Sequence, residues 1–292
     1  LAQMGQLLIL ANVTISNATA GTWGGAIDVN SGVSTLTNLT IAQSSAEIGG
    51  ALSLRGGTVI VTGGTIVGCS AEDGGALYVA GGELNVTGVN ITGSISQRDG
   101  SVLYSTGGAA TMVAVTIVDS TAIRYGGLKV EGGALAIFDS AISRSWARVC
   151  LLYAIGGGVM NVARCTIRES TAFAASVTWA EGDSLISLTG CAIVDSHVTL
   201  EYFGGALATA GGSTALVDCT LRSTVSVGPG GAIMLYSSGT LRLSHVVIDE
   251  SAAPRGAILH GRQGALESTL VDFTHVEFRV SACESLFAFD SP

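Results

Sequence analysis

The chain has 292 residues, of which 12% are charged, 48% are hydrophobic and 41 are glycine. An average soluble domain is about a quarter charged and about 7% glycine, so this chain is poor in charge and rich in glycine. It is nevertheless too apolar to be disordered. A net charge of −9 without any basic cluster argues against nucleic acid as a partner. Its apolar runs are too short to cross a bilayer as a helix, so we expect no membrane span.

A short motif, Gly-Gly-Ala followed by Ile or Leu, recurs along the chain. Intact copies begin at Gly24, Gly49, Gly74, Gly204 and Gly230, and degraded copies at Gly100, Gly126 and Gly256. The first three copies start 25 residues apart, and the last two intact copies start 26 residues apart. Between the two groups, residues 149–173 and 174–203 fit as two diverged coils. The repeat therefore predicts roughly ten coils and a partial one at the start.

A second motif, Thr-Ile and its variants, follows half a coil later. It occurs at Thr14, Thr40, Thr65, Thr116 and Thr166. Each coil thus contains short β-branched segments of period two, separated by glycine-rich bends, without a helical period. We predict an all-β fold, a right-handed parallel β-helix of about ten coils with about 25 residues each, forming one domain over residues 1–292. Because both termini fall in repeat-like sequence, we expect a segment of a longer extracellular polypeptide, or a second subunit covering an end.

The recurring Gly-Gly-Ala-[Ile/Leu] motif resembles the repeats of the polymorphic outer membrane protein (Pmp-like) β-helix family over nearly the whole chain. That family couples the motif to Phe-x-x-Asn, which this sequence lacks, so half of the signature is present. The resemblance implies a surface-exposed β-helix that serves adhesion or structure, and it brings no catalytic residue with it.

Aligning the coils on the Thr-Ile motif predicts which columns face the core. The column directly before the threonine is apolar and holds Cys165, Cys191 and Cys219 in three successive coils. A straight line of sulfurs suits neither a tetrahedral metal site nor the dihedral of a disulfide. We therefore expect buried free thiols that act as small hydrophobic side chains, and neither a metal nor another cofactor.

Five acceptor sequons for N-glycosylation use five of the seven asparagines of the chain. The middle residue of most triplets is apolar and is expected to point inward, which leaves Asn and Thr exposed. These sequons predict a glycosylated, extracellular or cell-surface protein. The acceptor residues are Asn12, Asn17, Asn38, Asn85 and Asn90.

Parallel β-helices also include polysaccharide-degrading enzymes, which need two carboxylates on one face. A column with Asp119, Arg144, Glu169, Asp195 and Glu250 places acids on successive coils. The interleaved arginine is typical of a surface charge ladder, and the sequence motifs of polygalacturonases are absent. We predict no catalytic residues and no enzyme, with a polysaccharide lyase or hydrolase as the third alternative.

One outward stripe on the Gly-Gly-Ala strands is a candidate binding face. It contains Tyr78, Tyr104 and Tyr153, which could stack on sugar rings, and Met234 and Leu259, which suit a protein partner. Ordinary β-propensity on a solvated face explains the same residues. The sequence thus predicts a structural or adhesive module of a secreted glycoprotein, such as an extracellular filament, a flagellar hair (mastigoneme) or a cell-wall component. Its expected partners are other copies or subunits of that assembly. The alternative is a carbohydrate-binding module that uses the tyrosine face for a polysaccharide.

Overall fold

The computed structural model describes residues 1–3, 5–200, 204–237, 239–261, 269–279, 285 and 287–289. The chain divides into two compact units, Leu1–Ser145 and Trp146–Pro292, each of which is described separately. All regular elements in these ranges are β-strands, and every strand pair that follows is parallel. Within the described ranges no helix offers the length and apolarity needed to cross a membrane.

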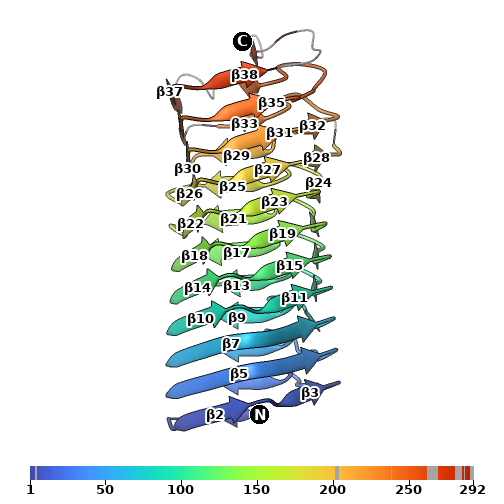
Figure 1. Cartoon of the computed structure of the whole chain (residues 1–292), viewed down its shortest axis with the longest axis vertical. Coiled ribbons are helices and arrows are strands. Elements are labelled where there is room, and N and C mark those ends of the chain that lie inside the picture. Colours follow the sequence, from blue (N-terminus) through green and yellow to red (C-terminus); the bar gives the residue numbers. More distant parts are fainter. Residues whose placement is uncertain are drawn as a thin grey trace. The chain divides into compact units, whose positions relative to one another are not determined.

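In the first unit each successive coil adds a rung to sheets A and B, and Figure 1 shows these rungs stacked one above the next. Sheet A is built from the Gly-Gly-Ala segments: β1 (Ala2–Gln3), β4 (Ile27–Val29), β6 (Leu52–Leu54), β9 (Leu77–Val79), β13 (Leu103–Ser105) and β17 (Leu128–Glu131). Sheet B turns a corner and includes the Thr-Ile segments: β2 (Leu7–Ala11), β3 (Thr14–Ser16), β5 (Val33–Ala42), β7 (Thr58–Val67), β10 (Glu83–Thr87), β11 (Asn90–Thr92), β14 (Ala109–Val113), β15 (Thr116–Val118), β18 (Ala134–Phe138) and β19 (Ala141–Ser143). Sheet C is short, with β8 (Ser70–Ala71), β12 (Ile95–Ser96) and β16 (Thr121–Ala122).

The second unit repeats this arrangement. Its sheet A contains β21 (Leu152–Ile155), β25 (Thr178–Glu181), β29 (Leu207–Ala210), β33 (Ile233–Leu235), β36 (Leu259–Gly261) and β39 (Phe287–Phe289). Its sheet B contains β22 (Val159–Ala163), β23 (Thr166–Arg168), β26 (Leu185–Thr189), β27 (Ala192–Val194), β30 (Ser213–Val217), β31 (Thr220–Arg222), β34 (Gly239–Ser244), β35 (Val247–Asp249), β37 (Thr269–Thr274) and β38 (Glu277–Arg279). Its sheet C contains β20 (Trp146–Ala147), β24 (Thr171–Ala172), β28 (His197–Val198) and β32 (Val225–Ser226). The prediction of a parallel β-helix is confirmed, with coils of about 26 residues.

The core is filled by in-register columns of apolar side chains. In sheet A of the first unit, Leu52 pairs with Leu77 and Leu103 pairs with Leu77, and all three are buried. In sheet B, Ile66 and Ile117 both pair with Ile91 in the same way. No coil could bury these side chains alone, so each coil is stabilised by its neighbours.

Sharp corners before and after the Thr-Ile segment shape each coil. Every non-glycine residue with a positive φ in the described ranges lies at one of these two corners, with φ between 48° and 56°. Asn12, Asn38 and Ala114 occupy the first corner, and Asp119 and Arg144 occupy the second. A left-handed backbone conformation costs most residues with a Cβ atom about 1–2 kcal/mol. The cost is smaller for Asn and Asp, and glycine, which has no Cβ atom, does not incur it. This preference explains the frequency of Asn, Asp and Gly at these positions.

The residue directly after each corner points inward and is often a small hydrogen-bond donor. Ser140 Oγ donates to the Phe138 carbonyl oxygen at 2.7 Å, and Ser44 Oγ donates to the Ala42 carbonyl oxygen at 3.3 Å. Both carbonyl oxygens also accept a backbone N–H from the neighbouring coil, so the hydroxyl adds a second hydrogen bond at the corner.

Candidate functional site

The outer face of sheet A in the first unit is the best candidate site, because its side chains form a continuous network. Strand pairing aligns Ser53 with Tyr78, Tyr78 with Tyr104, and Tyr104 with Lys129. Strand alternation places the flanking Leu and Val residues in the core and these side chains on the outside. In this unit the residues that the sequence assigned to the stripe are thus in register on successive strands.

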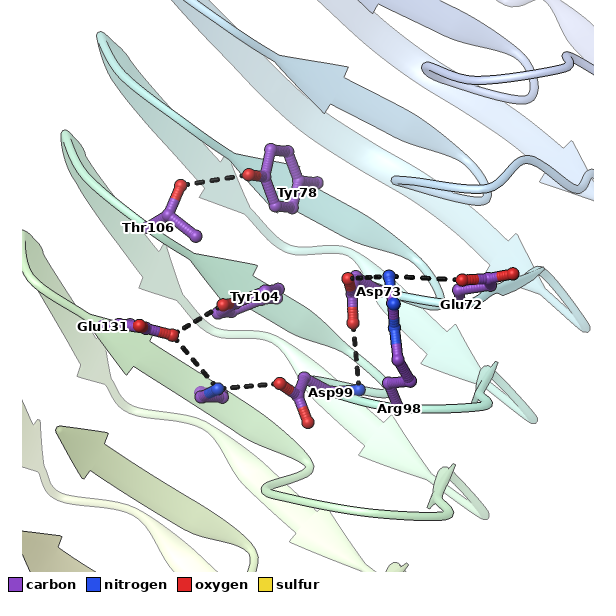
Figure 2. Close-up of polar contacts among 9 residues, drawn as sticks. Glu72, Asp73, Tyr78, Arg98, Asp99, Tyr104, Thr106 and Glu131 are labelled. Atoms are coloured by element: carbon purple, nitrogen blue, oxygen red, sulfur yellow. Dashed lines mark hydrogen bonds and ion pairs between the residues drawn. The ribbon is translucent and has the colours of Figure 1, made fainter.

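The tyrosines of the stripe are not free platforms. Tyr78 and Tyr104 are 8% and 9% exposed, and Tyr153 in the second unit is 4% exposed. Each hydroxyl forms a hydrogen bond with the next coil: Tyr78 with Thr106 Oγ1 at 3.0 Å, Tyr104 to Glu131 Oε2 at 2.7 Å, and Tyr153 to Glu181 Oε2 at 2.6 Å. Figure 2 shows the first two of these contacts. The tyrosines thus connect neighbouring coils, and their rings are covered by the contacts that they make.

A buried cationic centre lies next to Tyr104. Lys129 is 6% exposed, and its Nζ atom lies 2.7 Å from Asp99 Oδ2 and 3.2 Å from Glu131 Oε2. The same Nζ lies 4.7 Å from the ring centroid of Tyr104 and 5.5 Å from that of Tyr125. A lysine is almost never buried without a charged partner, and Asp99 and Glu131 supply two.

The charges around this centre follow from the fold. Figure 2 shows the contact of Glu131 with Tyr104, and Arg98 between Asp73 and Glu72. Glu131 also contacts the Lys129 ammonium. Burial and the hydrogen bond to Glu131 raise the pKa of Tyr104 far above its ordinary value. The hydrogen bond from Tyr104 and the charge of Lys129 hold the pKa of Glu131 below its ordinary value, although burial opposes them. At neutral pH, therefore, Tyr104 is a donor and Glu131 is an ionised acceptor.

At the start of the stripe a second ion pair connects coils in the same way. Arg55 donates to both carboxylate oxygens of Asp28, at 3.1 and 2.5 Å. The Arg55 guanidinium also lies 5.3 Å from the Trp23 ring, which in turn packs on Tyr78 with 5.7 Å between centroids. The aromatic faces at this end are thus already occupied by a cation and by each other.

The stripe in the second unit differs from the sequence prediction. Tyr153 pairs with Trp179, and Met234 pairs with His260, while Leu259 pairs with Ile233. The prediction that Leu259 faces outward beside Met234 is wrong. In this coil Gly256 is the first glycine of the motif and keeps the left-handed conformation, while Ala257 stands where other coils have the second glycine. Leu259 therefore aligns with Ile233, one residue before the position that the sequence alignment assigned to it. A shift of one residue exchanges the two faces of a strand. Met234 is 2% exposed and so offers no apolar surface to a partner.

The five sequon asparagines all lie in the first unit and at its surface. Asn12, Asn17 and Asn38 are exposed at the left-handed corners, Asn90 is exposed on β11, and Asn85 is half-buried on β10. The middle residues Leu39, Val86 and Ile91 are buried. As expected, then, the acceptor asparagines point outward where the middle residue points inward. Asn38 Nδ2 donates to Asn12 Oδ1 at 3.2 Å, so these two acceptors are direct neighbours on successive coils.

The cysteine column also lies where the sequence predicted it. Cys165, Cys191 and Cys219 are buried free thiols in successive rungs, directly after a left-handed corner. Cys165 and Cys219 donate to the carbonyl oxygens of Ala163 and Val217, both at 3.2 Å, as Ser140 does in its own coil. The hydrogen bond with Cys191 and burial raise the pKa of Cys219. Cys69 and Cys150 are also buried and free, whereas Cys283 lies outside the described residues.

Other chemistry-bearing groups form surface contacts. Asp119 and Arg144, which lie on the predicted charge ladder, form an ion pair with 2.8 Å between Nε and Oδ1. No group of three or more His, Cys, Asp or Glu among the described residues is arranged to hold a metal ion. A surface hollow in the second unit is lined by uncharged side chains and one arginine, Arg242, without a carboxylate.

The sequence did not predict the cluster of Asp99, Glu131 and Lys129. Strand alternation could have placed Lys129 and Glu131 on one face, since they are two residues apart on β17. Asp99 comes from the preceding coil, and only the three-dimensional register brings it to the amine. Searches with this chain find no matching protein-family model, curated protein or solved structure.

Proposed function

We propose that this chain is a structural or adhesive β-helix module of a secreted glycoprotein. The observation that carries the proposal is the position of the five sequons, whose asparagines all lie at the surface of the first unit. Three of them occupy corners that project from the coil, where a glycan can be accommodated without disturbing the core. An extracellular filament, a flagellar hair or a cell-wall component fits such a scaffold, with other copies or subunits of the assembly as partners.

The resemblance to Pmp-like repeats supports the same proposal. This chain and the Pmp-like repeats share Gly-Gly-Ala segments, which in this chain form the strands of sheet A and the bends that precede them. The bends need glycine for a physical reason: a Cβ atom at Gly24 would lie 2.1 Å from the Ile27 carbonyl oxygen, and one at Gly50 would lie 2.2 Å from the Gly75 carbonyl oxygen. The motif therefore serves coil stacking, and the proposed role at the cell surface is that of a scaffold.

The two alternatives receive less support. A carbohydrate-binding module would need the rings of Tyr78, Tyr104 and Tyr153, and these are covered by contacts with neighbouring coils. A polysaccharide lyase or hydrolase would need converging carboxylates. Asp119 and Glu250 are instead paired with Arg144 and Arg222 on the surface.

The proposal is tested by mapping glycans on the chain after secretion from a eukaryotic host. Enzymatic release of N-glycans in heavy-oxygen water marks each occupied asparagine as labelled aspartate, which mass spectrometry locates. We expect label at Asn12 or Asn38 and at one or more of the remaining sequons. The matched control is Thr14→Ala, which removes the Asn12 sequon and leaves the asparagine in place. Secreted protein without label at any of the five sites would overturn the proposal.

A further inference from the structure

Lys129 is placed for a covalent reaction as well as for an ion pair. Its amine lies 2.7 Å from the Asp99 carboxylate, and the two side chains are only 7% and 12% exposed. The second oxygen of Asp99, Oδ1, is buried and has no hydrogen-bond partner. The rings of Tyr104 and Tyr125 border the amine and limit its access to water.

A third group completes this arrangement. Glu131 Oε2 lies 3.2 Å from Lys129 Nζ, within reach of a proton on the amine, and is fixed there by the hydroxyl of Tyr104 at 2.7 Å. The Lys129 amine thus contacts both Glu131 and Asp99. A buried amine, a buried carboxyl and a positioned carboxylate are the three groups that amide formation requires.

We propose that Lys129 and Asp99 form an intramolecular amide bond in the folded protein, with Glu131 as the general base. The proposal concerns the chain's own covalent structure and stands whether or not the sequons are glycosylated. The bond joins β17 to the bend that precedes β13 in the coil below, and so links two successive coils covalently.

The reaction balances without a cofactor. In the poorly hydrated site, one proton passes from the Lys129 ammonium to the Asp99 carboxylate, which gives a neutral amine and a neutral acid. The amine nitrogen attacks Asp99 Cγ while its next proton passes to Glu131. The C–O bond to one carboxyl oxygen then breaks, and this oxygen leaves as water with the proton returned by Glu131. One C–N bond forms, one water molecule is released, and no electrons are transferred to or from the chain.

The sequence makes the test unusually direct, because Lys129 is the only lysine of the chain. Intact-mass spectrometry of the purified full chain should give a mass about 18 Da below the sequence mass, corresponding to one water. Trypsin should no longer cleave after Lys129, and residues 99–124 should be recovered joined to residues 125–144. The denatured protein should also contain no lysine side chain that reacts with an amine reagent.

Two variants separate the reaction from folding. Lys129→Arg keeps the positive charge but cannot form this bond, so its intact mass should equal the calculated one. Glu131→Gln keeps the size of the side chain and removes the base, and the linked fraction should form about 10²-fold more slowly. Circular dichroism confirms that each variant is folded. If Glu131→Gln fails to fold, the wild-type mass and peptide map decide alone. A folded wild-type chain with its full sequence mass and a reactive Lys129 would overturn the proposal.

Discussion

Each cysteine of the inward column forms a hydrogen bond with the local backbone. Cys165, Cys191 and Cys219 follow a left-handed corner and donate to the carbonyl oxygen two residues earlier, as Ser140 does in another coil. Sulfur, like a hydroxyl, is a small donor that fits this inward position. The position thus explains the cysteine column without a metal or a disulfide.

We expect these thiols to be unreactive while the protein is folded. Burial raises the pKa of Cys150 and Cys69, and the hydrogen bond with Cys191 together with burial raises that of Cys219. An aromatic disulfide reagent at pH 8 should therefore label none of Cys69, Cys150 and Cys219 in the folded protein. It should label these three cysteines after unfolding without reductant. Labelling that requires prior reduction would mean that disulfides connect the coils.

The same pKa shifts predict how stability depends on pH. The folded state holds the thiol protons of Cys69 and Cys150 more tightly than the unfolded chain, whose thiols titrate near 9.0. The corresponding stabilisation is complete below that pH and is lost as the pH rises towards the folded-state pKa values. The unfolding midpoint in denaturant should thus fall between pH 8 and pH 10, and replacing Cys150 with Ala should reduce this fall. A midpoint that does not change over this range would contradict the prediction.

Among the elements, the corners carry the largest backbone strain. Ala114 has a φ of 52° and is exposed, so its Cβ atom adds strain without adding core packing. Ala114→Gly should therefore stabilise the protein by about 0.5–1 kcal/mol, because relief of left-handed strain exceeds the entropy lost by glycine.

Ala141→Gly is the matched control for this substitution. Ala141 is also exposed but lies at the start of β19, outside the left-handed region. Glycine in a strand costs about 0.5–1 kcal/mol, so the two substitutions should have opposite signs in denaturant unfolding. Equal destabilisation by both would show that the corner conformation is not under strain.

For the whole molecule, the sequence was sufficient to predict the fold. Period-two segments repeated every 25 or 26 residues predict which side chains face the core, because only one register of each strand buries its apolar residues. The columns of Ile66, Ile91 and Ile117 and of the three cysteines followed directly. The prediction failed at Leu259, where Ala257 replaces a glycine and the motif alone cannot show which residue begins the strand.

The contacts between coils were harder to predict. Asp99 and Lys129 are 30 residues apart, more than one coil, and they meet because the lysine side chain leans towards the preceding coil. The burial of Tyr78 and Tyr104 likewise depends on hydroxyl partners that lie 28 and 27 residues away. Alternation along a strand predicts that a side chain points away from the core. It does not predict whether side chains of the neighbouring coils then bury it.

We expect the tyrosine face to hold the coils together and not to bind a ligand. Tyr104→Phe tests this expectation most directly, because it removes one hydroxyl, keeps the ring and takes from Glu131 the donor that lies 2.7 Å away. A hydrogen bond to a charged group contributes about 1.5–3 kcal/mol, so denaturant unfolding should show a loss of about that size. Neither the wild-type protein nor the variant should bind oligosaccharides on a glycan array. Unchanged stability together with oligosaccharide binding that the substitution abolishes would contradict the account.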